Sequence, residues 1–149
     1  MERESFRTVV RALITNKGEI LIGQKEEAED NKIGGKWHII GGHLEKGEQV
    51  EEAIEREVNE ETGLDVNTHQ IVDTSTFSWE ENGESDTVAI TFHCESGSRD
   101  AEAMDDLQDV KWVEPSELVE KVHPGEAERI KQREPMQNFL EKLEKMPAF

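Results

Sequence analysis

The segment from Gly42 to Leu64 constrains the fold of this chain more than any other part of the sequence. It contains eight glutamates and no proline, and its last residue but one is Gly63. Negative charge is favourable in the first turn of a helix, and glycine is common just after the last turn. The segment therefore predicts a helix from about Glu48 to Thr62.

The carboxylates of this expected helix fall into two groups. When the sequence is projected at about 100° per residue, Glu57 and Glu61 lie within the apolar face, and Glu60 borders it. A carboxylate that faces the interior is costly unless it is paired or binds a metal ion, and the C-terminal end of a helix disfavours negative charge. Three converging carboxylates offer the hard oxygen ligands that Mg²⁺ or Mn²⁺ prefers, so we favour a metal site over a solvated acidic patch. The apolar face consists of Val50, Ala53, Ile54 and Val58.

The residues before and within the helix suggest how its N-terminal loop is held. Arg56 lies a little over two turns after Glu48, so the two side chains would pair only if the helix begins after Glu48 and that residue folds back. Such a pair would brace the loop. We expect Gly41, Gly42 and Gly47 to let the backbone turn tightly and approach a ligand.

The remaining sequence predicts a mixed α/β sandwich. Strands are expected over residues 6–14, 19–25, 37–40, 69–79, 86–95 and 109–113, with hairpin turns at Asn16-Lys17-Gly18 and Asn82-Gly83. A short helix is expected from Pro115 to Val119 and a second over residues 135–145, whereas residues 26–35 and 96–108 are polar connections. The apolar face of the last helix favours core packing over a partner site, and it consists of Met136, Phe139, Leu140 and Leu143.

Composition narrows the class of protein. The 149 residues suit a single domain over residues 1–149, and the net charge of -18 disfavours nucleic acid and anionic membranes as partners. Because Cys94 is the single cysteine, no intrachain disulfide is possible, and we expect a buried, inert thiol. No apolar stretch is long enough for a membrane span, and no signal-peptide core is present, so we expect a cytoplasmic protein.

The segment from Gly42 to Leu64 resembles the Nudix box at every defined position. Gly42 is followed after five residues by Glu48 and after seven more by Arg56-Glu57; the match then runs through Val58 and Glu60-Glu61 to Gly63-Leu64. The resemblance implies a Nudix-type α/β/α sandwich with a mixed sheet. It also implies hydrolysis of a nucleoside diphosphate linked to another group, with divalent metal ions polarising the phosphate oxygens. A homodimer is a further implication of the resemblance.

The resemblance implies roles for individual residues. Glu57, Glu60 and Glu61 would hold the metal ions, the Gly41 carbonyl would be a further ligand, and Glu48 and Arg56 would support the loop and the helix. The catalytic base varies in the family; the candidates are Glu60, Glu102, Asp105 and Asp106. Two positions depart from common patterns. Ile40 stands where many members have proline, and His43 resembles the MutT-type triphosphate pyrophosphatases but could equally be a surface residue.

The sequence favours a nucleoside or deoxynucleoside triphosphate as substrate, cleaved to the monophosphate and pyrophosphate. Marks of other Nudix subfamilies are missing. ADP-ribose pyrophosphatases often have a proline near the position of Glu80, and dinucleoside polyphosphate hydrolases often have a tyrosine in that region, whereas this chain has no proline before Pro115 and no tyrosine. The coenzyme A pyrophosphatase signature is also missing. ADP-ribose or another nucleoside diphosphate derivative, and a non-catalytic nucleotide sensor, remain alternatives; an isoprenoid diphosphate isomerase fits poorly. Candidate substrate-binding residues are Gly42, His43 and Trp37. Phe77 and Trp79 are further candidates for base stacking, and Lys25, Lys36 and Arg7 for phosphate contacts, although core packing or a solvated surface would explain each.

Overall fold

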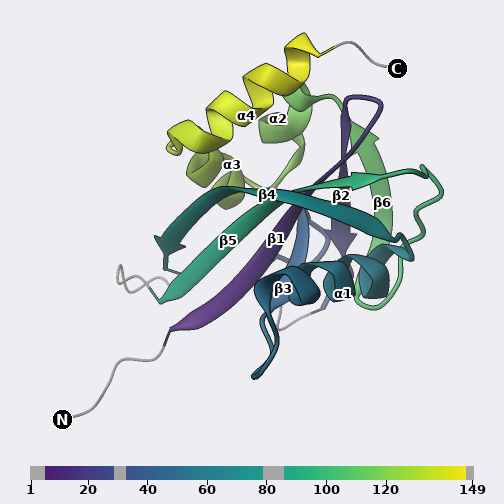
Figure 1. The fold of residues 1–149 in the computed structure, drawn as a ribbon, viewed down its shortest axis with the longest axis vertical. Helices are drawn as coiled ribbons and strands as arrows, with labels where there is room; N and C mark the ends of the chain where they lie inside the picture. Colours follow the sequence, from purple (N-terminus) through teal and green to yellow (C-terminus); the bar gives the residue numbers. More distant parts are fainter. Residues whose placement is uncertain (1–5, 29–32, 79–85, 147–149) are drawn as a thin grey trace.

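The computed structural model describes residues 6–28, 33–78 and 86–146. A six-stranded mixed sheet lies between one helix on one face and the C-terminal helices on the other, which confirms the α/β/α sandwich (Figure 1). The elements, in chain order, are β1 (Arg7–Asn16), β2 (Glu19–Lys25), β3 (Trp37–His43), α1 (Val50–Thr62), β4 (Val66–Phe77), β5 (Thr87–Ser96), β6 (Leu107–Val113), the 3-10 turn η1 (Pro115–Glu117), α2 (Leu118–Lys121), α3 (Pro124–Lys131) and α4 (Glu134–Lys145).

The strands are ordered β4-β5-β1-β3-β2-β6, and β1 and β5 run parallel while the other pairs are antiparallel. β1 and β2 form the expected hairpin. Its two turn residues, Lys17 and Gly18, both have positive φ (51° and 80°), which matches the twist of the flanking strands. The second expected turn, Asn82-Gly83, lies outside the described residues.

Helix α1 is confirmed, but it begins at Val50, two residues later than expected. Gly63 ends it in the left-handed conformation (φ 75°) and donates its N–H to the Asn59 carbonyl, as expected for a C-terminal cap. The side chains of Ala53, Ile54 and Val58 are fully buried against the sheet. The core beneath α1 also contains Val10, Ala12, Ile14, Leu21, Ile40, Leu64, Phe92 and Cys94.

The opposite core lies between the sheet and helices α2 to α4. The predicted apolar face of the last helix packs there: Met136, Leu140 and Leu143 are buried, and Phe139 packs against them. The short helix predicted from Pro115 becomes η1 followed by α2. Of the helices in the described residues, none is long and apolar enough to cross a membrane.

Helix α3 was missing from the prediction, which left residues 120–134 without an element. The helix is only eight residues long, and its buried apolar side chains are those of Ala127 and Ile130. Its start is well marked, because the His123 side chain accepts a hydrogen bond from the Glu126 N–H and Pro124 occupies the first turn. Pro124 was therefore the available sequence signal. Four predicted strands are also longer than expected: β1 continues to Asn16, β3 continues to His43, β4 begins at Val66, and β6 begins at Leu107.

Candidate active site

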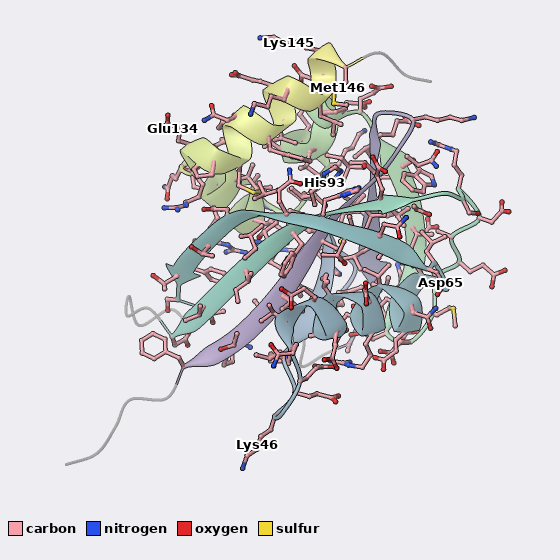
Figure 2. All side chains as sticks on the ribbon, in the orientation of Figure 1. Lys46, Asp65, His93, Glu134, Lys145 and Met146 are labelled. Carbon is pink, nitrogen blue, oxygen red and sulfur yellow. The ribbon has the colours of Figure 1, made fainter. Side chains whose placement is uncertain are left out.

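A cleft of about 440 Å³ opens along β3, from His38 to His43. One end is bordered by α1, which contributes Glu57 and Glu61. The other end is bordered by α3, which contributes Glu126 and Arg129. The loop before α1 extends away from the body of the molecule, with Lys46 at its tip (Figure 2).

The three predicted metal-binding carboxylates differ in burial as the helical projection indicated. Glu61 is 2% exposed, and its Oε2 atom has no hydrogen-bond partner. Burial raises the pKa of Glu61 to about 8 and also raises the pKa of Glu57. The Glu60 side chain is 49% exposed and does not line the cleft. Two carboxylates of α1 therefore face the cleft, and the third lies outside it, against Arg56.

Arg56 joins the loop to the helix. Because α1 begins after Glu48, that residue folds back, and its carboxylate accepts from Arg56 Nε (2.7 Å) and Nη2 (3.1 Å). A third hydrogen bond to Glu48 comes from the Glu45 N–H (3.0 Å), and Arg56 Nη2 also donates to the His43 carbonyl (3.2 Å). The bidentate contact with Arg56 lowers the pKa of Glu48. The predicted brace between Glu48 and Arg56 is present.

Arg56 also reaches the carboxylates of the cleft. Its Nη1 atom donates to Glu57 (3.0 Å) and to Glu60 (3.2 Å). As the side chains stand, no three His, Cys, Asp or Glu side chains within residues 6–28, 33–78 and 86–146 are grouped closely enough to hold a metal ion. A cation would therefore have to draw Glu57, Glu60 and Glu61 together.

The glycine pair acts differently from expectation. Gly41 and Gly42 continue β3 and pair with β1 without left-handed φ values, whereas Gly47 turns the loop at φ 86°. A Cβ atom at Gly42 would overlap the carboxyl group of Glu57, and one at Gly41 would overlap the Val10 carbonyl. The pair therefore allows close approach of the backbone to its neighbours, rather than a turn.

Residues 98–106 cross from β5 to the cleft along the end of α1. The N–H groups of Glu102 and Met104 donate to the carbonyls of Thr62 (3.0 Å) and Glu61 (2.9 Å), the last residues of the helix. Asp105 then adopts positive φ (56°), and Asp106 contacts Lys25 Nζ at 2.5 Å. Of the acidic residues considered as a base here, Asp105 and Asp106 line the cleft, and Glu102 does not.

The end of the cleft near α3 contains residues that the sequence did not single out. His38 on β3 is 6% exposed, and Glu126 on α3 is 3% exposed and contacts the partly buried Arg11 of β1. The Arg129 guanidinium lies over the Phe77 ring at 4.2 Å, and His123 completes this wall. These residues come from segments far apart in the chain, which is why local patterns could not group them.

The remaining predicted residues divide between the cleft and other places. Phe77, Lys25, Arg7, Gly42 and the exposed His43 line the cleft. Trp37 does not; it packs against the core on the α4 side, and Lys111 lies over its ring at 4.2 Å. Lys36 is exposed and also does not line the cleft, and Trp79 lies outside the described residues.

The comparisons with known proteins identify the family. The NUDIX domain model matches residues 5–133. This chain is a Nudix hydrolase. The nucleoside triphosphatase NudI of Escherichia coli K12 is 34% identical in an alignment that covers 76% of this chain and 85% of that protein.

Solved structures share the fold of this Nudix hydrolase. A MutT protein from Methanosarcina mazei Go1 superimposes with a TM-score of 0.64 at 26% identity, covering 96% of both chains. A Nudix hydrolase from Nitrosomonas europaea has a TM-score of 0.72 at 16% identity, covering 99% of this chain and 78% of that one. The similarity therefore includes the C-terminal helices as well as the sheet and α1.

Nudix hydrolases generally use divalent metal ions, and the donors present in this cleft fit such an ion. Glu61 has a buried carboxylate oxygen without a partner, which is unfavourable unless a ligand satisfies it. Gly42 leaves room for the Glu57 carboxyl group beside it. Carboxylate oxygens are the donors that hard divalent cations prefer. The α1 end of the cleft therefore contains two carboxylates, Glu57 and Glu61, of the donor type that such an ion binds.

Proposed function

We propose that this Nudix hydrolase cleaves a nucleoside or deoxynucleoside triphosphate to the monophosphate and pyrophosphate, with Mg²⁺ or Mn²⁺ as the metal ion. The buried Glu61 carboxylate carries the proposal, because its Oε2 atom has no partner and it lies beside Glu57 in a cleft. The relative NudI is named a nucleoside triphosphatase, which supports the substrate class.

Within this proposal, Glu57, Glu60 and Glu61 hold the metal ions, together with the carbonyl of Gly41. The bound ions supply charge that polarises the phosphate oxygens and stabilises the transition state. Arg56 lies against Glu57 and Glu60 and is itself held by Glu48, so this pair positions the ligands of α1. The role of the Arg56–Glu48 pair is to restrict the movement of the Glu57 and Glu60 carboxylates.

The cleft also offers groups for the attacking water and for the phosphates. Asp105 and Asp106 line the cleft, and we propose that one of them accepts the proton of water; Glu60, which contacts Arg56, is the other candidate. The Lys25 ammonium, which contacts Asp106 at 2.5 Å, and the guanidinium of Arg7 would meet the triphosphate. Gly42 and His43 border the same part of the cleft.

The test is hydrolysis of a panel of common and oxidised nucleoside triphosphates, ADP-ribose, nucleoside diphosphate sugars and dinucleoside polyphosphates, with and without Mg²⁺. We expect metal-dependent release of monophosphate and pyrophosphate from a triphosphate, identified by chromatography. Glu57→Gln should lower kcat/KM at least about 100-fold, because metal-assisted charge stabilisation provides several kcal/mol. Glu55→Gln is the matched control, since Glu55 is an exposed residue of the same helix.

Other outcomes would replace the proposal. Cleavage of ADP-ribose or of another diphosphate derivative in preference to all triphosphates would change the substrate class. Tight, metal-dependent binding of a nucleotide without turnover of any compound would indicate a sensor instead of an enzyme.

A further inference from the structure

The two ends of the cleft differ in chemistry. The α1 end holds the carboxylates of Glu57 and Glu61 near the ammonium of Lys25. At the α3 end, Arg11 contacts Glu126, and the other lining residues include two histidines, the Phe77 ring and the Arg129 guanidinium. An anionic chain with metal ions suits the first end, whereas a planar group that can stack on Phe77 and Arg129 suits the second.

His38 presents a hydrogen-bond acceptor in the middle of the cleft, with Lys25 and Asp106 near it on one side and Arg11 and His123 on the other. Its Nδ1 atom lies 2.8 Å from the Ile39 carbonyl oxygen, which can only accept, so Nδ1 carries the proton. Burial lowers the pKa of His38 to about 4, which leaves the ring neutral near pH 7. The Nε2 atom therefore has a free lone pair, and this buried atom has no partner in the structure. A ligand with an N–H group would satisfy it.

His123 is fixed in the opposite tautomer. Its Nδ1 atom accepts the N–H of Glu126 (3.3 Å), so the proton of the neutral ring lies on Nε2. The pKa of His123 is also lowered to about 4, first by burial and then by the nearby Arg129. Backbone groups thus make His38 Nε2 an acceptor and His123 Nε2 a donor, and the donor lies 3.8 Å from Glu126 Oε2.

Arg129 and Phe77 add a flat surface beside these two rings. The Arg129 guanidinium lies 4.2 Å from the centre of the Phe77 ring, and its buried Nε atom has no partner. Arginine planes and aromatic rings both stack on nucleobases. A base held here would meet a stacking surface and hydrogen-bonding groups together.

We propose that His38, His123 and the Arg129–Phe77 stack form the nucleobase subsite and determine which base this enzyme prefers. The inference rests on the proposed function, because it divides one nucleotide between the two ends of the cleft. On β3, His38 precedes Gly41 by three residues, or about 10 Å of extended strand, which separates the base from the phosphates. His38 and Arg129 each have a buried nitrogen without a partner, so the site is incomplete without a ligand.

The first experiment measures base preference. kcat/KM is determined for ATP, GTP, CTP, UTP and dTTP with the wild-type enzyme and with His38→Phe, His38→Asn and Arg129→Met. Loss of a buried hydrogen bond to one base should reduce the preference for the best over the worst base roughly tenfold in His38→Phe. His38→Asn, which keeps a side-chain acceptor, should retain more of the base preference than His38→Phe does. His69→Phe is the matched control, because His69 does not line the cleft.

A uniform fall in kcat/KM for all five nucleotides in His38→Phe and Arg129→Met would overturn the inference, because it would indicate a structural or phosphate-binding role.

The second experiment uses the wild-type protein and does not depend on turnover. Nitrogen NMR of histidine-labelled protein in Mg²⁺ follows the Nε2 resonance of His38 during addition of nucleoside 5′-monophosphates or ribose 5-phosphate. The nucleotides should shift this resonance, and ribose 5-phosphate should not. Equal shifts with both would place phosphate or sugar at the subsite and overturn the inference. Base-dependent shifts without hydrolysis of any triphosphate would refute the proposed function and leave the subsite standing.

Discussion

Gly42 illustrates how one residue without a side chain determines the geometry of the cleft. It continues β3 in an ordinary strand conformation, so conformational freedom does not explain the glycine. The reason is space, because a Cβ atom would overlap the carboxyl group of Glu57. Glu57 can approach the strand only because residue 42 has no side chain.

We expect Gly42→Ala to lower kcat/KM about 100-fold, since a displacement of about 1 Å in a catalytic group has an effect of that size. The fold should survive, because Glu57 can rotate toward Arg56 and solvent. Steady-state kinetics and thermal unfolding of the variant measure the two effects separately. Gly97→Ala is the control, because a Cβ atom there would meet nothing within 4 Å. Activity within twofold of wild type in Gly42→Ala would show that the carboxylate does not need this space.

At the scale of elements, the segment of residues 98–106 ties the end of α1 to the sheet. Arg99 fixes its start: Nη2 contacts Glu19 at 2.5 Å, Nη1 donates to the Asn16 carbonyl at 3.2 Å, and the guanidinium lies 4.7 Å from the Trp112 ring centre. Further along, Met104 donates to the last turn of α1. This attachment brings the following Asp105 and Asp106 to the cleft.

Arg99→Met should release this segment without unfolding the protein. We expect faster amide hydrogen exchange at Glu102 and Met104, and a fall in kcat of about tenfold as Asp105 and Asp106 lose their fixed position. Lys111→Met is the matched control, because Lys111 also lies over a tryptophan ring but away from the cleft. Unchanged exchange at both amides would show that the helix contacts alone hold the segment.

For the whole molecule, the net charge of -18 opposes the compact state through self-repulsion. Among the described residues, Arg56, Arg99 and Arg133 each contact at least one carboxylate, but acidic residues outnumber basic ones 35 to 17. Binding of an anionic nucleotide must therefore rely on local positive charge and metal ions rather than on attraction by the molecule as a whole.

Salt should stabilise this protein. Raising the NaCl concentration from 20 to 500 mM shortens the Debye length from roughly 20 Å to about 4 Å and screens the repulsion between acidic residues. We expect Tm, measured calorimetrically in the presence of a metal chelator, to rise by several degrees. A fall in Tm over this range would mean that the local ion pairs outweigh the net repulsion.

The sequence alone determined the features that depend on local periodicity. In a helix, side-chain direction follows from position, so the inward direction of Glu57 and Glu61 and the more exposed position of Glu60 were predictable from spacing alone, whereas the difference in burial between Glu57 and Glu61 was not. The cap at Gly63 and the turn at Lys17-Gly18 were predictable because both require positive φ. The Nudix box fixed the family for the same reason, since its residues occupy one continuous segment.

Only the tertiary structure decided which distant segments meet. His38 and His123 are 85 positions apart and line one cleft because α3 packs beside β3. Trp37, adjacent to His38, packs against the core on the α4 side instead, since neighbouring residues of a strand point to opposite faces. The reason for a glycine at position 42 became clear only from its contact with the Glu57 carboxyl group, which lies far along the chain from it. Such contacts depend on how elements pack, and the spacing of residues along one chain does not contain that information.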